Sequence, residues 1–230
     1  MTAVDMAFHF SERRGFRQDD GTDLTTLVIE TATAACSVAL LRDGHVVAQA
    51  HEVVGRGHAE RLIPMIAELP GQGRADRILV DCGPGSFTGV RVGLAAARGL
   101  AIGWGAEVHG FSSLALIAAA AFAADAGLAE LAVLLEGGHG EVFMQGFTAS
   151  PFAADGPLAS LLPEAALATL GARTGAGSGI ARLAPLAPGH DLRDALPRAA
   201  DALLLAPDFA NLAPVPIYGR APDAKLPEAR

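Results

Sequence analysis

Residues 81–93, DCGPGSFTGVRVG, decide the fold of this chain. The run before them, RILV at residues 77–80, is apolar and has the length of a buried strand. Gly83, Gly85 and Gly89 permit backbone angles or close approaches that a Cβ would block. The segment therefore predicts a strand, a tight turn and a helix in direct succession.

The helix of this unit is expected to begin near Gly89, with Ser86 or Thr88 as its N-cap. Backbone N–H groups at such a start lack partners within the helix. A turn of this kind can cradle an anion or hold two backbones close together. The residues that we expect to form this nucleotide-binding or structural loop are Glu30, Thr31, Gly83, Pro84, Gly85, Ser86, Phe87, Thr88, Gly89 and Arg91.

Three strands are predicted upstream. Residues 25–30 are rich in β-branched side chains, and the apolar runs 36–41 and 45–50 flank an Asp-Gly pair, which is a strong hairpin signal. A helix is expected over residues 58–69. Three antiparallel strands followed by helix, strand and helix fit a ribonuclease-H-like half.

The second half of the chain repeats part of this pattern. Strands are expected over residues 107–110, 131–136 and 141–147, and the last two enclose a glycine-rich turn that follows an acid, as at Glu30. We therefore expect two related lobes, with the N-terminal lobe complete and the C-terminal lobe degenerate. The expected boundaries are a disordered extension (1–24), an N-terminal lobe (25–110), a C-terminal lobe (111–220) and a loose tail (221–230).

The composition predicts a globular protein with a sizeable core, since 51% of the 230 residues are hydrophobic and 18% are charged. A net charge of −8 argues against unaided binding to nucleic acid. The longest apolar helix is interrupted by Arg91 and Arg98, and no signal-peptide core is evident, so a cytoplasmic location without membrane contact is expected. Cys36 and Cys82 are interpreted as small buried hydrophobes.

The common catalytic patterns do not fit. The residue four after His58 is Leu62, so the two-histidine helical metal pair is missing. Val90 stands directly after Gly89 where a P-loop has its lysine, which excludes a P-loop, and the spacing of Gly85, Ser86 and Gly89 differs from a hydrolase elbow. We expect no metal, no catalytic residue and no cofactor held by this chain alone.

The helix over residues 89–103 is more apolar than one sheet face requires, because Arg91 and Arg98 are its only polar residues. Two interpretations stay open. Either another chain covers the additional apolar surface of this helix, or the helix is buried inside the chain's own core. The first predicts a partner interface made by His58, Leu62, Met65, Ile66, Leu69, Gly89, Gly93, Ala96, Ala97 and Leu100.

Several motifs together resemble the bacterial TsaB (YeaZ) family of tRNA threonylcarbamoyladenosine biosynthesis proteins. They are IETAT at residues 29–33, His58 with LIP at 62–64, the glycine string up to Gly93, and PIYGR at 216–220. The resemblance implies a two-lobed, actin-like ATPase fold of the α/β class. The sequence departs from the family pattern at residues 136–138, where it has Glu-Gly-Gly in place of Asp-Ala-Arg or a similar sequence.

The resemblance also implies a function. The chain would be a non-catalytic scaffold that binds and activates a TsaD-like catalytic subunit, together with a TsaE-like ATPase. It would contact tRNA only through the complex, form a homodimer when alone, and share any ATP or ADP at the boundary with its partners. A residual ATPase or a glycoprotease-like peptidase is the alternative.

Overall fold

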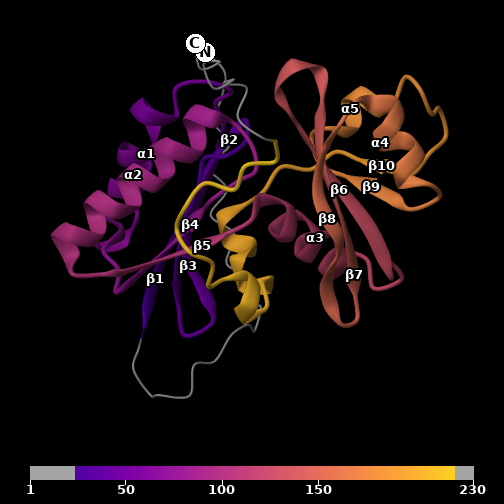
Figure 1. Ribbon diagram of the computed structural model, residues 1–230. Coiled ribbons are helices and arrows are strands. Elements are labelled where there is room, and N and C mark those ends of the chain that lie inside the picture. The colour runs from indigo at the N-terminus through magenta and orange to yellow at the C-terminus, as the bar shows by residue number, and fades with distance from the viewer. Residues whose placement is uncertain (1–23, 221–230) are drawn as a thin grey trace, which may run out of the picture.

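The computed structural model describes residues 24–220 (Figure 1). The predicted extension (1–24) and the predicted tail (221–230) lie outside the described residues, apart from Leu24. The described chain forms two five-stranded sheets, with helix α3 (Ser113–Ala124) between them. The predicted α/β architecture with two lobes is confirmed.

The first sheet has the strand order β3-β2-β1-β4-β5. Strands β1 to β3 pair antiparallel, while β4 and β5 are parallel to β1 because helical crossovers precede them. The strands are β1 (Thr25–Glu30), β2 (Ala35–Arg42), β3 (His45–Val53), β4 (Arg77–Asp81) and β5 (Glu107–Phe111). The crossovers contain α1 (His58–Ala67), a 3₁₀ turn η1 (Pro70–Gly73) and α2 (Phe87–Trp104).

The second sheet repeats this topology, with the order β10-β9-β6-β7-β8. Its strands are β6 (Glu130–Glu136), β7 (Val142–Ala149), β8 (Phe152–Leu161), β9 (Thr174–Ala176) and β10 (Leu192–Arg193). Its helices are α4 (Pro163–Leu170) and α5 (Ile180–Leu183), with the 3₁₀ turn η2 (Gly138–Gly140) between β6 and β7. The second sheet keeps all five strand positions of the first. The predicted degeneracy of this lobe lies in the length of its strands, since β9 has three residues and β10 has two.

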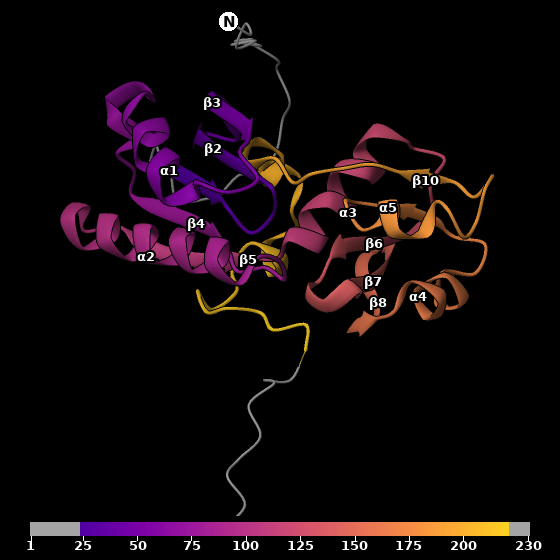
Figure 2. The ribbon, with the colours of Figure 1, turned by 90° about the horizontal axis from the view of Figure 1, so that it is seen from above.

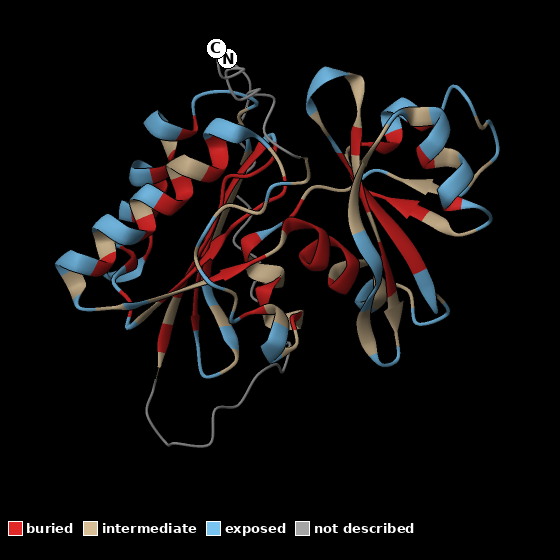
Figure 3. Ribbon diagram, in the orientation of Figure 1, coloured by how far each residue is buried: buried red, intermediate tan, exposed pale blue. Residues whose placement is uncertain are grey.

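The layers follow from the alternation of side chains along each strand. Leu27 and Ile29 of β1 point to α1 and α2, whereas Val28 between them points to α3. Leu131 and Val133 of β6 reach the same central cluster from the other sheet. Helix α3 is therefore buried between the two sheets, as the dark red helix in the middle of Figure 3 shows.

The segment that follows β10 returns to the first lobe. The 3₁₀ turn η3 (Ala199–Leu204) packs on β2 and α3, and η4 (Pro207–Phe209) follows it. Leu212 then forms a β-bridge with Gly110, and the Ile217 N–H donates to the Cys82 carbonyl oxygen at 2.8 Å. Figure 2 shows this yellow segment running beside β5 and α2. We call residues 212–220 the return segment.

Candidate functional site

The glycine-rich turn between β4 and α2 packs against the loop that follows β1. A Cβ on Gly85 would collide with the Ala32 carbonyl, and a Cβ on Gly89 would collide with the Thr31 carbonyl. The Ser86 N–H donates to the Ala32 carbonyl oxygen at 2.6 Å. Of the two roles that the sequence left open, these glycines serve the close approach of two backbones.

Two buried carboxyl groups hold this junction together. Glu30 Oε1 accepts the Ala32 N–H at 2.8 Å, and Asp81 accepts the Gly83 N–H at 2.7 Å and the Ser113 hydroxyl at 2.7 Å. Burial raises the pKa of both carboxyl groups, and the nearby charge of Asp81 raises that of Glu30 further. Glu30 Oε2 is buried and has no hydrogen-bond partner among the described residues. Asp81 therefore holds the glycine-rich turn, and Glu30 holds the loop after β1 that packs against it.

A cleft of about 1080 Å³ lies between the two lobes. The first lobe contributes the loop at Ala32–Ala34 and the start of α2, and the second contributes the turn at Gly137–His139. Ile217 to Arg220 of the return segment complete the wall. Of the predicted loop residues, Gly85, Ser86, Phe87 and Arg91 line this cleft, whereas Glu30, Thr31, Gly83 and Pro84 are buried behind it.

The charges in the cleft fall into two groups. The acids Glu136 and Glu141 each have a cationic neighbour, since Arg182 lies 3.4 Å from Glu136 and Arg220 lies 3.4 Å from Glu141. Arg91 instead donates to the Phe87 carbonyl oxygen at 2.8 Å and to the Tyr218 hydroxyl at 2.9 Å. Its guanidinium carbon lies 3.3 Å from the centroid of the Phe87 ring. Arg91 is thus oriented without a carboxylate.

The predicted partner interface needs correction. Most of its side chains fill the chain's own core beneath α1 and α2, because they occupy the helix faces that pack on the sheet. The buried members are His58, Leu62, Met65, Ile66, Leu69, Gly89, Gly93 and Ala97, and Ala96 and Leu100 are half-buried. His58 Nε2 lies 2.9 Å from the Ala35 carbonyl oxygen, which gives this histidine a structural role.

The opposite face of α2 carries exposed apolar and small residues that were not among those predicted for the interface. Ala95, Gly99, Ile102 and Gly103 are exposed, and the Ile102 side chain is 88% exposed. We call these four residues the exposed α2 strip. Ile63 on the neighbouring α1 is 48% exposed. Figure 3 shows exposed residues along the outer side of both helices.

The two arginines of α2 have a role that the sequence analysis missed. The sequence identifies them as the only polar residues of the helix and places Arg91 in the predicted loop. In the structure Arg91 bonds to Tyr218, and Arg98 donates to the Pro214 carbonyl oxygen at 2.8 Å. Both arginines therefore hold the return segment. The aromatic and proline residues of PIYGR at 216–220 gave no local signal for this pairing.

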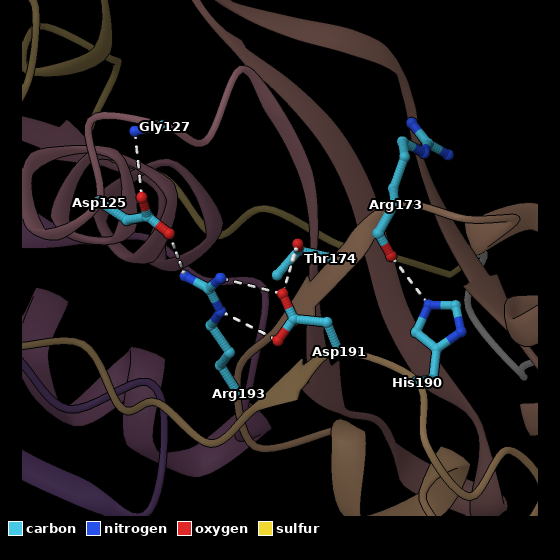
Figure 4. A network of polar contacts seen from close by, with 7 residues as sticks. All are labelled: Asp125, Gly127, Arg173, Thr174, His190, Asp191 and Arg193. Atoms are coloured by element: carbon cyan, nitrogen blue, oxygen red, sulfur yellow. Dashed lines mark hydrogen bonds and ion pairs between the residues drawn. The ribbon is translucent and has the colours of Figure 1, made fainter.

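A separate polar network lies in the second lobe (Figure 4). Arg193 at the end of β10 bonds to Asp191 at 2.9 Å and to Asp125 at 3.0 Å, and the Thr174 hydroxyl donates to Asp191 at 2.8 Å. These bonds lower the pKa of Asp191, mainly through Arg193. The network ties the two short strands to the end of α3.

Other functional features can be stated for the described part of the chain. Between residues 24 and 220 no group of three or more metal-ligating side chains comes together, and no helix is long and apolar enough to cross a membrane. Cys36 and Cys82 are both buried and unbridged, as predicted. Burial raises the pKa of each thiol to about 12.

Comparison with known proteins adds to this picture. Residues 46–150 match the family model described as "TsaD: tRNA N6-adenosine threonylcarbamoyltransferase". The tRNA threonylcarbamoyladenosine biosynthesis protein TsaB of Haemophilus influenzae is 44% identical over 105 residues, which are 44% of each chain. Its Escherichia coli counterpart is 39% identical over 123 residues, covering 51% of this chain and 52% of that one. The chain thus spans about half the length of these relatives.

A solved structure covers far more. YeaZ from Pseudomonas aeruginosa superposes with a TM-score of 0.71 at 30% identity, covering 85% of this chain and 99% of that chain. A second Pseudomonas aeruginosa structure, described as similar to peptidase YEAZ, has a TM-score of 0.72 at 30% identity and is covered completely, with 86% of this chain matched. Together with the two repeated sheets, these matches establish the predicted two-lobed actin-like fold.

Proposed function

This chain belongs to the TsaB (YeaZ) family, and on that premise we propose that it is a non-catalytic subunit of the machinery that makes N6-threonylcarbamoyladenosine in tRNA. It binds and activates a TsaD-like catalytic subunit in the cytoplasm, and tRNA is contacted only through the complex. A TsaE-like ATPase is a further partner.

The observation that carries this proposal is the exposed α2 strip. Ile102 is 88% exposed beside the small residues of the strip, with the exposed Arg98 four residues before it. An apolar side chain exposed to this degree is the kind of surface that a protein partner covers. A Cβ added at Gly99 or Gly103 would meet no other atom within 4 Å. The backbone at these two glycines is therefore open, and a partner helix can approach it closely. Ile63 on the neighbouring α1 is a second exposed apolar side chain.

The chemistry around the cleft floor supports a scaffold role. Two buried acids accept hydrogen bonds here: Asp81 from the Gly83 N–H of the glycine-rich turn and from Ser113, and Glu30 from the Ala32 N–H of the loop that the turn packs against. The turn itself serves backbone contact. Under this proposal any ATP or ADP binds at the boundary with the partner subunits. In the absence of the catalytic subunit, the same strip forms a homodimer. A residual ATPase or peptidase is the alternative.

The test is co-expression with the TsaD-like subunit from the same organism, followed by native mass measurement. We expect a defined complex. Ile102→Glu should weaken binding by about tenfold or more, because it buries a charge in an apolar interface. Leu162→Glu is the matched control, since Leu162 is 57% exposed at the start of α4 in the other lobe and should leave binding unchanged.

Two results would overturn the proposal. One is a complex that forms equally well with Ile102→Glu, provided that circular dichroism shows a folded chain. The other is robust tRNA modification or nucleotide hydrolysis by the chain without the catalytic subunit, which would favour the enzyme alternative.

A further inference from the structure

Two carboxyl groups lie next to each other in the core of the first lobe. The parallel pairing of β1 with β4 runs to the next-to-last residue of each strand, so the last residues, Glu30 and Asp81, are neighbours. Both side chains point to the face that α3 covers, because Val28 and Leu79, two residues before them, pack in the cluster around that helix. Glu30 and Asp81 are each 0% exposed.

No cation neutralises this pair. Among residues 24–220, no arginine or histidine lies within salt-bridge distance of Glu30 or Asp81. Burial, and then the charges of Glu30 and Asp81 respectively, raise the pKa of the Cys36 and Cys82 thiols to about 12, so both thiols are uncharged. Two ionised carboxylates in this position would therefore face each other without compensation.

The ionisable groups on the surrounding elements have other neighbours. Burial lowers the pKa of His51 on β3, and the nearby charge of Arg198 lowers it further. His109 on β5 lies 3.4 Å from Glu107. The turn η3 packs on β1 and carries an acid, Asp201, and α3 has no ionisable side chain. None of these elements places a cation against the pair.

The two carboxyl groups differ in the hydrogen bonds that they accept. Asp81 accepts the Gly83 N–H at 2.7 Å, and the Ser113 hydroxyl lies 2.9 Å and 2.7 Å from its two oxygens. Glu30 Oε1 accepts two backbone N–H groups of the loop after β1, whereas Glu30 Oε2 is buried and has no partner among the described residues. The orphaned oxygen is the one atom of the pair that a proton would turn into a donor.

We propose that Glu30 and Asp81 share one proton at neutral pH, which Glu30 Oε2 donates to the Asp81 carboxylate, and that this proton holds the junction between the loop after β1 and the glycine-rich turn. When the junction opens, Glu30 releases the proton to water. Without the proton, two adjacent buried charges repel each other, one attached to the loop and one to the turn. The residues involved lie outside the exposed α2 strip, so this inference does not depend on the proposed function.

The direction of the pH dependence follows from linkage. Burial raises the pKa of Glu30, and the charge of Asp81 raises it further, so the closed junction keeps a proton that the open junction loses. The junction is therefore most stable at low pH. Above an unfolded pKa of about 4.3, opening becomes about tenfold more favourable per pH unit until the folded pKa is reached.

The wild-type chain allows a direct test by NMR. Its glutamates are labelled with ¹³C at the side-chain carboxyl, and each resonance is followed from about pH 4 to pH 9. Glu30 is the only buried glutamate among residues 24–220. We expect one resonance that still has the shift of a protonated carboxyl at neutral pH and that is missing from Glu30→Gln. If every glutamate carboxyl is ionised at neutral pH, the proposal is wrong.

Amide exchange tests whether the proton holds the junction. The Ser86 N–H of the turn donates to the Ala32 carbonyl oxygen at 2.6 Å, so it exchanges when the junction opens. In the wild type its protection factor should fall by about tenfold or more between about pH 6 and pH 8. In Glu30→Gln, whose amide N–H₂ replaces the acidic O–H, it should change by less than about twofold.

The controls separate this effect from a general response to pH. Glu60→Gln removes an exposed carboxylate from α1 and should follow the wild type. The Gly179 N–H, which donates to the Leu134 carbonyl oxygen at 2.9 Å in the second lobe, should keep a constant protection factor. Asp81→Asn removes the acceptor charge and should also abolish the fall, which covers the case that Glu30→Gln does not fold. A constant protection factor at Ser86 in the wild type, or an undiminished fall in the folded variants, would overturn the proposal.

Discussion

The Arg91 guanidinium on α2 donates a hydrogen bond to the Tyr218 hydroxyl at 2.9 Å, across 127 residues of sequence. Arg98, two turns further along the helix, donates to the Pro214 carbonyl. The return segment is thereby fixed along α2, where its residues form one wall of the interlobe cleft. The only tyrosine of the chain thus joins its C-terminal part to the helix that the glycine-rich turn initiates.

Tyr218→Ala should loosen the return segment without unfolding the protein. The hydrogen bond and the ring contact with Arg91 are largely exposed, so we expect a loss in the free energy of unfolding of about 1 kcal/mol or less. Amide exchange at Ile217, whose N–H donates to the Cys82 carbonyl, should become faster. Val215→Ala, which removes another exposed side chain of this segment, is the control and should leave the exchange rate unchanged. Equal rates in both variants would show that Arg91 does not hold the segment.

Gly89 and Gly99 lie on the same helix, and the same substitution should have opposite effects at the two positions. Gly89→Ala places a Cβ against the Thr31 carbonyl and should destabilise the protein by about 1–3 kcal/mol or more. Gly99→Ala meets open space and should stabilise it by up to about 1 kcal/mol, because alanine favours the helix. Urea unfolding of the two variants measures the difference. Similar effects at both positions would contradict the close approach of the turn to the β1–β2 loop.

Glu30→Gln should alter how stability depends on pH. Burial raises the folded-state pKa of Glu30 and Asp81 above their unfolded values, so the wild type loses stability as pH rises from the unfolded pKa towards the folded pKa. For Asp81 the loss falls mainly between an unfolded pKa of about 3.9 and its folded pKa of about 7, and for Glu30 it begins above an unfolded pKa of about 4.3. The variant carries one ionisable group fewer, and its unfolding temperature should therefore fall less over this range.

Glu60→Gln, which removes an exposed carboxylate from α1, is the matched control for this experiment. Its melting temperature should follow that of the wild type from pH 4 to pH 8 within about a degree, as for most surface changes. If the melting temperature of Glu30→Gln falls with pH in parallel with that of the wild type, the ionisation of Glu30 does not contribute to the loss of stability.

Arg193→Gln should affect only the second lobe. It removes the bonds to Asp125 and Asp191, which hold β10 near the end of α3 (Figure 4). These groups are exposed and screened by salt, so the effect on global stability should be small and should fade at high ionic strength. Amide exchange at Gly175 and Gly177, whose N–H groups donate to the carbonyls of Asp191 and Arg193, should be faster at low salt. Faster exchange in β1 would contradict a local role.

Much of the architecture could be predicted from local patterns. The hairpin at Asp43 and Gly44, the strand before Asp81 and the helix after Ser86 all have short-range signals, and the structure contains each of them. The echo of the first lobe in the second was also visible, because both lobes place an acid at the end of the strand that starts the repeat. What the sequence understated was the second sheet, whose two- and three-residue strands are too short to show periodicity.

The functional surfaces depended on tertiary structure. The sequence by itself determined that α2 is apolar on nearly every side, since only Arg91 and Arg98 interrupt it. It could not determine which side meets the sheet, because an all-round apolar helix has no phase that favours one face. The structure turns Gly93 and Ala97 inward and Gly99 and Ile102 outward. In the same way, the glycine string predicted a close approach, and only the fold showed that its counterpart is the Thr31–Ala32 backbone.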